Sequence, residues 1–223
     1  TKIGITRRPG ADEDEWGRDG SLDYLLAAAE ASVARLGFEP DAILLHRVNR
    51  EQQPFARTVE NLLQVRERGI VARVGIGNVH LDECETAWEV SGGTIAAVEN
   101  ERSPRYRDDA EIVGWAGERG VAYLAWSPLG QDHARRLGEL YPEFAAVAAE
   151  QSSSLGREVT AQQVALAWLV ASGPTLVPIP GFTRTATVDS SAAAADLVLS
   201  PEQRARLDAS PAGPGSMYPD DED

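Results

Sequence analysis

The chain has 223 residues, 43% of them hydrophobic, and a formal net charge of −14 at pH 7. This acidity argues against sequence-independent binding of nucleic acid, which needs lysines and arginines that neutralise phosphates. No segment reaches the roughly 20 apolar residues of a membrane span, and no signal peptide pattern opens the chain. Because Cys84 is the only cysteine, an internal disulfide is excluded, and we expect a protein of the reducing cytoplasm.

Short apolar segments alternate along the chain with longer amphipathic ones. The apolar segments predict strands buried on both faces, and the amphipathic segments predict helices, the first two of which end at Gly37 and Gly69. The predicted strands are Lys2–Ile5, Ala42–His46, Ala72–Gly77, Ile95–Glu99, Ala122–Trp126 and Leu176–Ile179. The predicted helices are Ser21–Leu36, Pro54–Arg68, Leu81–Val90, Asp108–Arg119, Arg135–Gln151, Thr160–Val170, Thr185–Ala194 and Pro201–Leu207.

This sixfold β–α order predicts a parallel sheet with right-handed crossovers, either open and doubly wound or closed into a barrel. Polar residues stand where most of the strands end, and a barrel gathers its strand ends around one mouth. We therefore favour an α/β fold, a TIM (β/α)8 barrel of which six of the eight βα units are visible. Since the chain opens on Thr1 rather than Met, two units of about 30 residues each are expected before it. The polar residues are His46, Asn78, Glu99 with Asn100, and Ser127.

No linker divides the chain, so residues 1–210 are predicted to form a single, N-terminally incomplete barrel domain. Residues 211–223 are rich in Pro and Gly, end in four acidic residues, and predict an acidic C-terminal tail in solvent. The segment Thr6–Gly20 is rich in Gly, Arg and acidic residues and predicts a solvated loop. Loops at a barrel mouth can close over ligands, so Trp16 in this segment is a candidate to line a substrate pocket.

Six short motifs at the strand ends resemble those of the aldo-keto reductase family, in the family's order. Val74–Asn78 resembles its Gly-Val-Ser-Asn segment, Ala97–Asn100 its Val-Gln-Asn segment, and Ala125–Gly130 its Tyr-Ser-Pro-Leu-Gly segment. Each motif alone is weak, but six in register are specific. The other three are Thr1–Gly4, Leu44–Arg47 and Val177–Arg184, which resemble the family's Thr-Lys-x-Gly, Leu-His and Ile-Pro-Gly-x-x-Arg segments.

The resemblance implies an oxidoreductase that transfers a hydride from NADPH to the carbonyl carbon of an aldehyde or ketone. Lys2 matches the lysine that, held by an aspartate, lowers the pKa of a proton-donating tyrosine, since a fixed ammonium favours the phenolate. His46 matches the histidine that orients and polarises the carbonyl. Read without the resemblance, Lys2 is a surface lysine and His46 a core histidine. The family's tyrosine and aspartate lie on the second barrel strand, before Thr1, and Tyr106 is a poor replacement.

The resemblance also implies an NADPH site along the strand ends. Next to Gly77, Asn78 would bind the carboxamide of the nicotinamide. Glu99 replaces the family's usual glutamine, and a carboxylate can accept from that amide but cannot donate to it. Trp126 would stack on the nicotinamide, with a buried strand aromatic as the alternative. The residues expected along the pyrophosphate are Ser127, Pro128, Leu129 and Gly130.

The loop before the helix predicted at Thr185 is the expected phosphate site. A helix N-terminus binds anions, and Arg184 adds a guanidinium fork that suits a 2′-phosphate, which favours NADPH over NADH. Gly181 and Thr183 belong to the same loop, and a solvated Arg184 is the alternative. Ser190 and Ser191 stand where the family often has the Glu-Asn pair that holds the adenine, and no metal-ligand spacing is present.

Two other functions remain open at this point. A truncated, catalytically inactive homologue could bind nucleotide, or a protein partner that covers exposed barrel edges. A lyase could use Lys2 as a Schiff-base amine on a barrel strand. The leading hypothesis predicts a small-molecule carbonyl compound as the partner, with no nucleic acid and no membrane.

Overall fold

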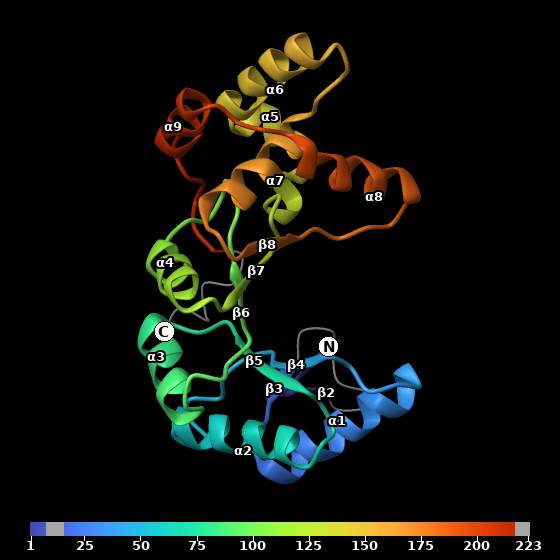
Figure 1. Ribbon diagram of the computed structural model, residues 1–223, viewed down its shortest axis with the longest axis vertical. Helices are drawn as coiled ribbons and strands as arrows, with labels where there is room; N and C mark the ends of the chain where they lie inside the picture. The colour runs from blue at the N-terminus through green and yellow to red at the C-terminus, as the bar shows by residue number, and fades with distance from the viewer. Residues whose placement is uncertain (8–15, 217–223) are drawn as a thin grey trace. The chain divides into compact units, whose positions relative to one another are not determined.

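The computed structural model describes residues 1–7 and 16–216. The chain forms two compact units, Thr1–Glu99 and Asn100–Asp223. Among the described residues, the strands of the first unit lie in the order β1-β4-β5-β6 and pair in parallel (Figure 1), and β7 pairs in parallel with β8 in the second unit. No helix in this part of the chain is long and apolar enough to cross a membrane.

The first unit is built on parallel strands with buried apolar side chains. Ile43 and Leu45 of β4 are almost fully buried on one face of the sheet, and Leu44 is buried on the other, as expected for a strand covered on both faces. Helix α1 packs against α2, and α2 packs against α3. The elements are β1 (Lys2–Ile3), β2 (Ile5–Arg7), β3 (Trp16–Arg18), α1 (Leu22–Leu36), β4 (Ala42–Leu45), α2 (Phe55–Glu67), β5 (Arg73–Gly77), α3 (Leu81–Val90) and β6 (Ala97–Glu101).

The second unit combines two parallel strands with a cluster of helices. Strand β7 pairs with β8, with Trp126 opposite Ile179. Helix α6 packs against α7 and α9 (Figure 1), and the rings of Phe144 and Trp168 meet edge to face at 5.7 Å. The elements are α4 (Ala110–Arg119), β7 (Ala122–Trp126), η1 (Gln131–Arg136), α5 (Leu137–Leu140), α6 (Pro142–Leu155), α7 (Ala161–Ser172), β8 (Leu176–Ile179), α8 (Thr185–Ala192), η2 (Ala193–Asp196) and α9 (Pro201–Ala209).

Most of the predicted elements are confirmed. Strands β7 and β8 and helix α3 have the predicted bounds. Helix α7 begins after Thr160, whose hydroxyl accepts from the Gln163 N–H at 3.2 Å while the Gln163 side chain accepts from the Thr160 N–H at 3.0 Å. This reciprocal capping box fixes the start of the helix. Helix α1 begins at Leu22 with Ser21 as its N-cap, as predicted, although the Ser21 side chain makes no capping hydrogen bond.

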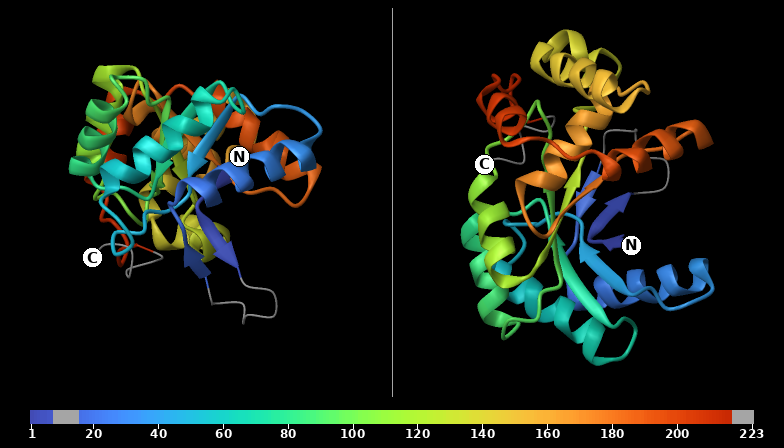
Figure 2. Two further views of the ribbon diagram at one scale, coloured as in Figure 1. Left: turned by 90° about the horizontal axis from the view of Figure 1, so that it is seen from below. Right: turned by 45° about the horizontal axis from the view of Figure 1, so that its top comes forward.

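The prediction of a solvated loop at Thr6–Gly20 is wrong for those residues of the segment that the structure describes. Gly4, at φ 105°, ends β1, and β2 then pairs antiparallel with β3, with Arg7 opposite Trp16 (Figure 2). The Asn49 side chain donates to the Arg18 carbonyl at 2.8 Å, and Arg18 donates to the Val48 carbonyl at 3.3 Å. The loop after β4 therefore holds this hairpin. Residues 8–15 lie outside the described residues.

The single helix predicted at Arg135–Gln151 is also wrong. The structure has η1, α5 and α6 in this stretch, and Tyr141 between α5 and α6 lies outside the helical region, at φ −129° and ψ 77°. Tyr141 precedes Pro142, and a residue before proline is pushed out of the helical conformation by the proline ring. Pro142 itself is suited to the first turn of α6, where a missing N–H is harmless.

The first residues of the predicted tail contact the loop after β6. The Gly213 N–H donates to the Arg105 carbonyl at 2.8 Å, the Arg105 side chain donates to the Gly215 carbonyl at 3.0 Å, and the Ser216 hydroxyl donates to Glu101 at 2.9 Å. These bonds hold residues 213–216 against unit 2. Residues 217–223 of the predicted tail lie outside the described residues.

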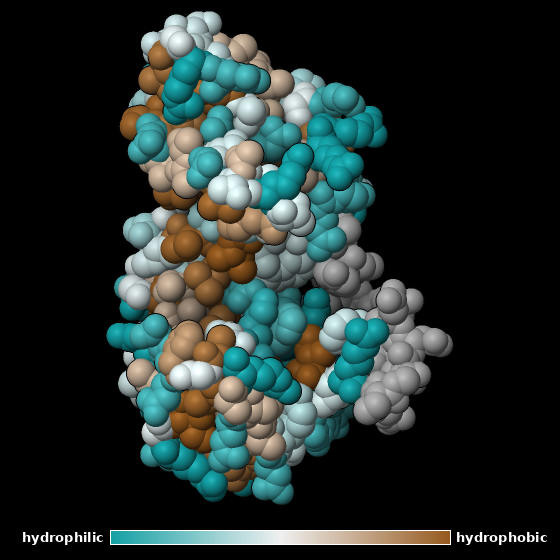
Figure 3. All heavy atoms as spheres, turned by 90° about the vertical axis from the view of Figure 1, so that its right-hand side faces the viewer, coloured by the Kyte–Doolittle hydropathy of each residue, from teal (hydrophilic) through white to brown (hydrophobic). Residues whose placement is uncertain are grey.

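Strand β8 has one edge without a strand partner among the described residues. Apolar groups interrupt the hydrophilic surface in Figure 3, and Val177 and Ile179 of β8 and Phe182 after it are among the exposed large apolar side chains. An exposed apolar edge of this kind can accept a further strand.

Arg107 is predicted to hold α9 in the second unit. Its guanidinium lies 4.7 Å from the centre of the Trp168 ring and donates to the Leu207 carbonyl and the Ser210 hydroxyl. Arg107→Met is expected to lower the free energy of unfolding by about 2–3 kcal/mol, because a cation–π contact and charged hydrogen bonds are lost. Denaturant unfolding of this variant beside Arg204→Met, an exposed change on α9, measures the effect. Equal losses in both variants would contradict the assignment.

Candidate functional site

Four predicted site residues lie on one face of the sheet in the first unit. The register pairs Lys2 with Leu44, Leu44 with Gly75, and Gly77 with Glu99. Paired residues of parallel strands share a face, as do residues two apart along a strand. Lys2, His46, Gly77 and Glu99 therefore face the same side. His46 and Gly77 stand just past or at the end of a strand, whereas Glu99 lies in the middle of β6 rather than at its predicted end.

Lys2 forms an ion pair with Glu99. Its Nζ lies 2.5 Å from Oε1 of Glu99, and the two side chains are 34% and 6% exposed. Lys2 is the only lysine of the chain, whose other side-chain cations are arginines and histidines. A lysine is a compact point charge that can exchange its proton, which an arginine does not do in proteins. The one residue of this type thus stands at the predicted catalytic position.

His46 is held through its backbone at the end of β4. Its N–H donates to the Ile3 carbonyl at 2.7 Å, and its carbonyl accepts from the Asn78 side chain at 2.7 Å. Burial, with Lys2 and Arg47 adding positive charge nearby, lowers the pKa of His46 to about 4. Near pH 7 the ring is therefore a neutral imidazole, which can donate one hydrogen bond without carrying a charge.

This shift makes the stability of the fold depend on pH. Because the folded pKa of His46 is below its ordinary 6.5, the unfolded chain binds the proton more readily. The contribution of His46 to the free energy of unfolding is therefore complete above about pH 6.5 and is lost as the pH falls towards about 4. Its size is about 2 kcal/mol after a discount for partial solvent exposure. Unfolding of wild type and His46→Gln at about pH 7 and about pH 4.5 measures it. A stability difference that does not change with pH would refute the assignment.

Asn78 connects the end of β5 to the residue after β4 and to β6. Besides its bond to the His46 carbonyl, its N–H donates to the Glu99 carbonyl at 3.0 Å. Its φ of 54° lies in the left-handed region, which asparagine tolerates better than most residues. A Cβ on the adjacent Gly77 would lie 3.1 Å from the carbonyl oxygens of Leu45 and Glu99. The sequence Gly77-Asn78 therefore suits this tight junction.

Lys2 and His46 line a cavity of about 550 Å³ in the first unit, together with Trp16 and Tyr24. Trp16 is 57% exposed, and the Arg7 guanidinium lies 5.3 Å from its ring centre. Tyr24 has no motif around it, so no local pattern predicts its place in this cavity. Its hydroxyl donates to the Ile5 carbonyl at 2.6 Å, and burial raises its pKa, with Asp19 adding to the effect. Tyr24 is thus unsuited to become a phenolate beside Lys2.

The predicted pyrophosphate residues form a tight turn after β7 in the second unit. Ser127, after Trp126, has a φ of 48°, its carbonyl accepts from the Gly130 N–H at 2.8 Å, and its hydroxyl accepts from Gln131 at 3.0 Å. Gly130 has a φ of 74°, which glycine adopts at no steric cost. Pro128 is buried and Leu129 half-buried within this turn.

The predicted phosphate loop after β8 leads directly into α8. Arg184 is the N-cap of this helix, with φ −146° and ψ 144°, and Gly181, Thr183 and Arg184 are exposed. Arg184 makes no ion pair with any described residue. The first N–H groups of a helix have no partner inside it, so this loop offers them to an anion. Ser190 instead uses its carbonyl to accept from Gln163 at 2.9 Å.

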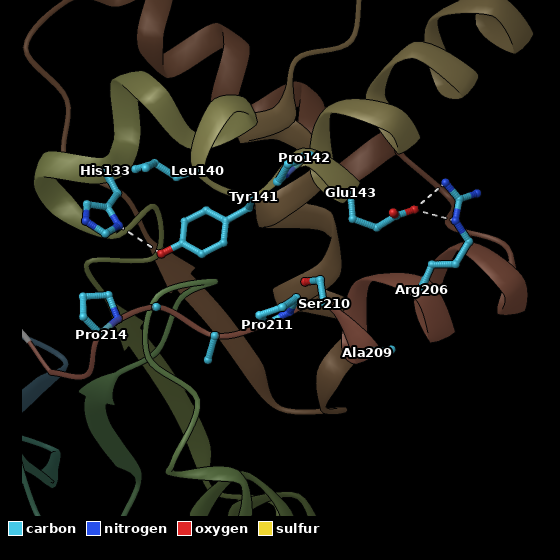
Figure 4. A pocket seen from close by; sticks show the side chains of 12 residues that line it. His133, Leu140, Tyr141, Pro142, Glu143, Arg206, Ala209, Ser210, Pro211 and Pro214 are labelled. Atoms are coloured by element: carbon cyan, nitrogen blue, oxygen red, sulfur yellow. Dashed lines mark hydrogen bonds and ion pairs between the residues drawn. The ribbon is translucent and has the colours of Figure 1, made fainter.

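A second cavity, of about 610 Å³, lies in the second unit and contains none of the predicted site residues (Figure 4). His133 and Tyr141 line it and share a hydrogen bond of 2.9 Å, and Glu143 and Arg206 form an ion pair at its rim. The structure thus brings Lys2, His46, Gly77, Asn78 and Glu99 together in the first unit. The residues of the second unit that are predicted to bind the cofactor lie at the end of β7 or in the loops after β7 and β8, which pair with each other.

Comparison with known proteins finds relatives along nearly the whole chain. A sequence model of the Aldo/keto reductase family matches residues 1–211. Pyridoxine 4-dehydrogenase of Escherichia coli (strain K12) is 30% identical over 214 residues, which cover 93% of this chain and 70% of that protein. Probable aldo-keto reductase 1 of Glycine max is 29% identical over 222 residues, which cover 90% of this chain but only 62% of that protein.

Solved structures support the same grouping. An aldo/keto reductase from Klebsiella pneumoniae, crystallised in complex with NADP and acetate, matches with a TM-score of 0.70 at 26% identity, covering 83% of this chain and 64% of that one. This similarity confirms the predicted α/β barrel class. The chain spans less than two thirds of the length of that structure and of the Glycine max protein.

Proposed function

The chain belongs to the aldo/keto reductase family, and on that premise we propose that the complete protein is an oxidoreductase that reduces an aldehyde or ketone with NADPH. The observation that carries this proposal is the meeting of the only lysine with a neutral histidine in one cavity. In this proposal NADPH supplies the hydride when it is bound. The side chains of this chain bind and orient the reactants.

His46 is the proposed donor to the carbonyl oxygen of the substrate. A neutral imidazole gives a hydrogen bond to an oxygen that gains negative charge in the transition state, and it needs no change of its own charge to do so. The N–H bond of His46 to the Ile3 carbonyl and the bond that its own carbonyl accepts from Asn78 fix its backbone. Lys2 is proposed to hold positive charge beside the group that gives the substrate its proton. The family's tyrosine and aspartate are not among these 223 residues, so the activity is proposed for the complete protein.

The second unit supplies residues that fit a dinucleotide. The turn Ser127–Gly130 directly follows β7, and Ser127 is proposed to contact the pyrophosphate there. Arg184, without an ion pair to any described residue, and the N-terminus of α8 fit a phosphate. The reductase from Klebsiella pneumoniae, whose structure contains NADP, supports the same cofactor for this chain. Trp126 is proposed to stack on the nicotinamide.

The test is carbonyl-dependent oxidation of NADPH by the complete protein, with a panel of aldehydes and ketones. Turnover that needs both NADPH and a carbonyl compound is expected. NADPH binding without turnover would favour the second candidate, a catalytically inactive homologue that binds nucleotide. The supporting observation is that Lys2 and His46 are present while the family's tyrosine and aspartate are not among these 223 residues. A lyase that uses Lys2 as an amine is disfavoured, because the ion pair with Glu99 engages the nitrogen.

A further inference from the structure

We propose that the cavity of the second unit binds a small, neutral, largely apolar molecule that presents one hydrogen-bond acceptor, such as a carbonyl oxygen. The proposal does not depend on the proposed function, since none of the residues assigned to the carbonyl substrate or to NADPH lines this cavity. Its volume of about 610 Å³ is in the usual range for small-molecule sites, which are mostly apolar with a few placed polar groups. The apolar side chains of its lining are those of Leu140, Pro142, Ala209, Pro211, Ala212 and Pro214.

A chain of hydrogen bonds leads from Arg105 through His133 to Tyr141 in the cavity wall. The Arg105 guanidinium lies 3.1 Å from Nε2 of His133, and Nδ1 of His133 lies 2.9 Å from the Tyr141 hydroxyl oxygen (Figure 4). A guanidinium only donates, so Nε2 accepts, and the network assigns the hydrogen of the neutral imidazole to Nδ1. His133 therefore donates to the oxygen of Tyr141.

Tyr141 is thereby left with a hydrogen to donate. Its hydroxyl oxygen accepts from His133, and its own hydrogen has no acceptor among the described residues. Tyr141 is only 5% exposed, and burial raises the pKa of its phenol, so the hydrogen is retained near neutral pH. A buried donor without a partner is costly. An acceptor oxygen on a molecule in the cavity would satisfy it.

The segment after α9 forms a wall of the cavity and passes this hydroxyl at a glycine. A Cβ on Gly213 would lie 2.5 Å from the Tyr141 hydroxyl oxygen, so a side chain at this position would collide with it. The Gly213 N–H donates to the Arg105 carbonyl at 2.8 Å, and the Arg105 side chain donates to the Gly215 carbonyl at 3.0 Å. Arg105 thus holds this wall in place as well as starting the chain of hydrogen bonds.

The charges at the rim argue against a charged ligand. Arg206 pairs with Glu143 at 2.5 Å and with Glu150 at 2.7 Å, so two carboxylates engage the one arginine of the lining. An anion would meet no free cation there, and a cation would leave water for an apolar lining whose carboxylate is already paired. A neutral molecule that accepts from Tyr141 leaves these ion pairs intact.

Benzophenone and diphenylmethane are the probes, because both are neutral and similar in shape, and they differ in the carbonyl oxygen. Calorimetric titration of the complete protein without NADPH measures their binding in the absence of reduction. Tyr141→Phe removes the hydroxyl and keeps the ring, and Ala212→Phe adds a ring to the lining at an exposed position. Tyr24→Phe, which removes a hydroxyl from the cavity of the first unit, is the matched control.

Tyr141→Phe is expected to weaken benzophenone binding by about three- to tenfold, the effect of one neutral hydrogen bond, and to leave diphenylmethane binding unchanged. Ala212→Phe should weaken both probes by about tenfold or more, and Tyr24→Phe should bind both like wild type. Ultraviolet irradiation attaches bound benzophenone to nearby C–H groups, so mass spectrometry should find the label on peptides that contain Tyr141 or Ala212. Unchanged benzophenone affinity in Tyr141→Phe, label only on peptides of the first unit, or no saturable binding to wild type would each overturn the proposal.

Discussion

Lys2→Met is expected to lower kcat for carbonyl reduction by about 10²–10⁴-fold, the usual contribution of positioned proton-transfer groups. Methionine keeps the length and the apolar part of the side chain but removes the ammonium. The proposed tyrosine would then lose the charge that favours its phenolate form. Lys2 is not one of the residues proposed to bind the cofactor, and it is far in sequence from the phosphate loop of the second unit. NADPH binding should therefore be retained.

Steady-state kinetics and a fluorescence titration with NADPH measure these two quantities on the same preparation. Arg57→Met is the matched control, since it also removes one cation but at an exposed position on α2. It should retain wild-type kcat. A Lys2→Met enzyme with kcat within about threefold of wild type would show that the lysine has no catalytic role.

Arg184→Ala is expected to raise the dissociation constant of NADPH by about 10–100-fold, because hydrogen bonds to charged groups contribute about 1.5–3 kcal/mol. The guanidinium lies at the exposed start of α8 and has no ion pair with any described residue, so it is available to a phosphate. NADH lacks the 2′-phosphate, and its weaker binding should hardly change. The variant would therefore lose its preference between the two cofactors.

Titration of both cofactors against wild type, Arg184→Ala and Arg157→Ala separates this effect from general loss of charge. Arg157 is also an exposed arginine of the second unit, in a loop after α6, and its removal should leave both dissociation constants as they are. Equal weakening of NADPH and NADH by Arg184→Ala would contradict a contact to the 2′-phosphate.

Much of the fold could be predicted because the pattern of the chain is regular. Continuous apolar segments such as Ala122–Trp126 form strands with the predicted bounds, since burial on both faces imposes that composition. The break at Tyr141 was also available to sequence reasoning, because Pro142 excludes a continuous helix. The hairpin of β2 and β3 was not, since its Gly- and Arg-rich composition is typical of loops. It is stabilised by distant side chains, such as Asn49 bound to the Arg18 carbonyl.

The candidate site could be predicted residue by residue but not as a set of contacts. Lys2, His46 and Glu99 each follow from a motif at a strand end. The ion pair between Lys2 and Glu99 joins positions 97 residues apart on strands that are not neighbours, and it depends on strand register and on glycines in β5. Tyr24 lines the cavity only because of the way α1 packs, and such packing leaves no local pattern in the sequence.

The most direct test of the proposed function follows the hydride itself. The complete protein is incubated with NADPH that carries deuterium at its transferable position and with an aldehyde substrate, and the alcohol product is analysed by mass spectrometry. Our account predicts one deuterium on the former carbonyl carbon of the alcohol, and no such product with Lys2→Met. Alcohol without deuterium at that carbon, or no alcohol while NADPH remains bound, would contradict the assignment of carbonyl reductase activity.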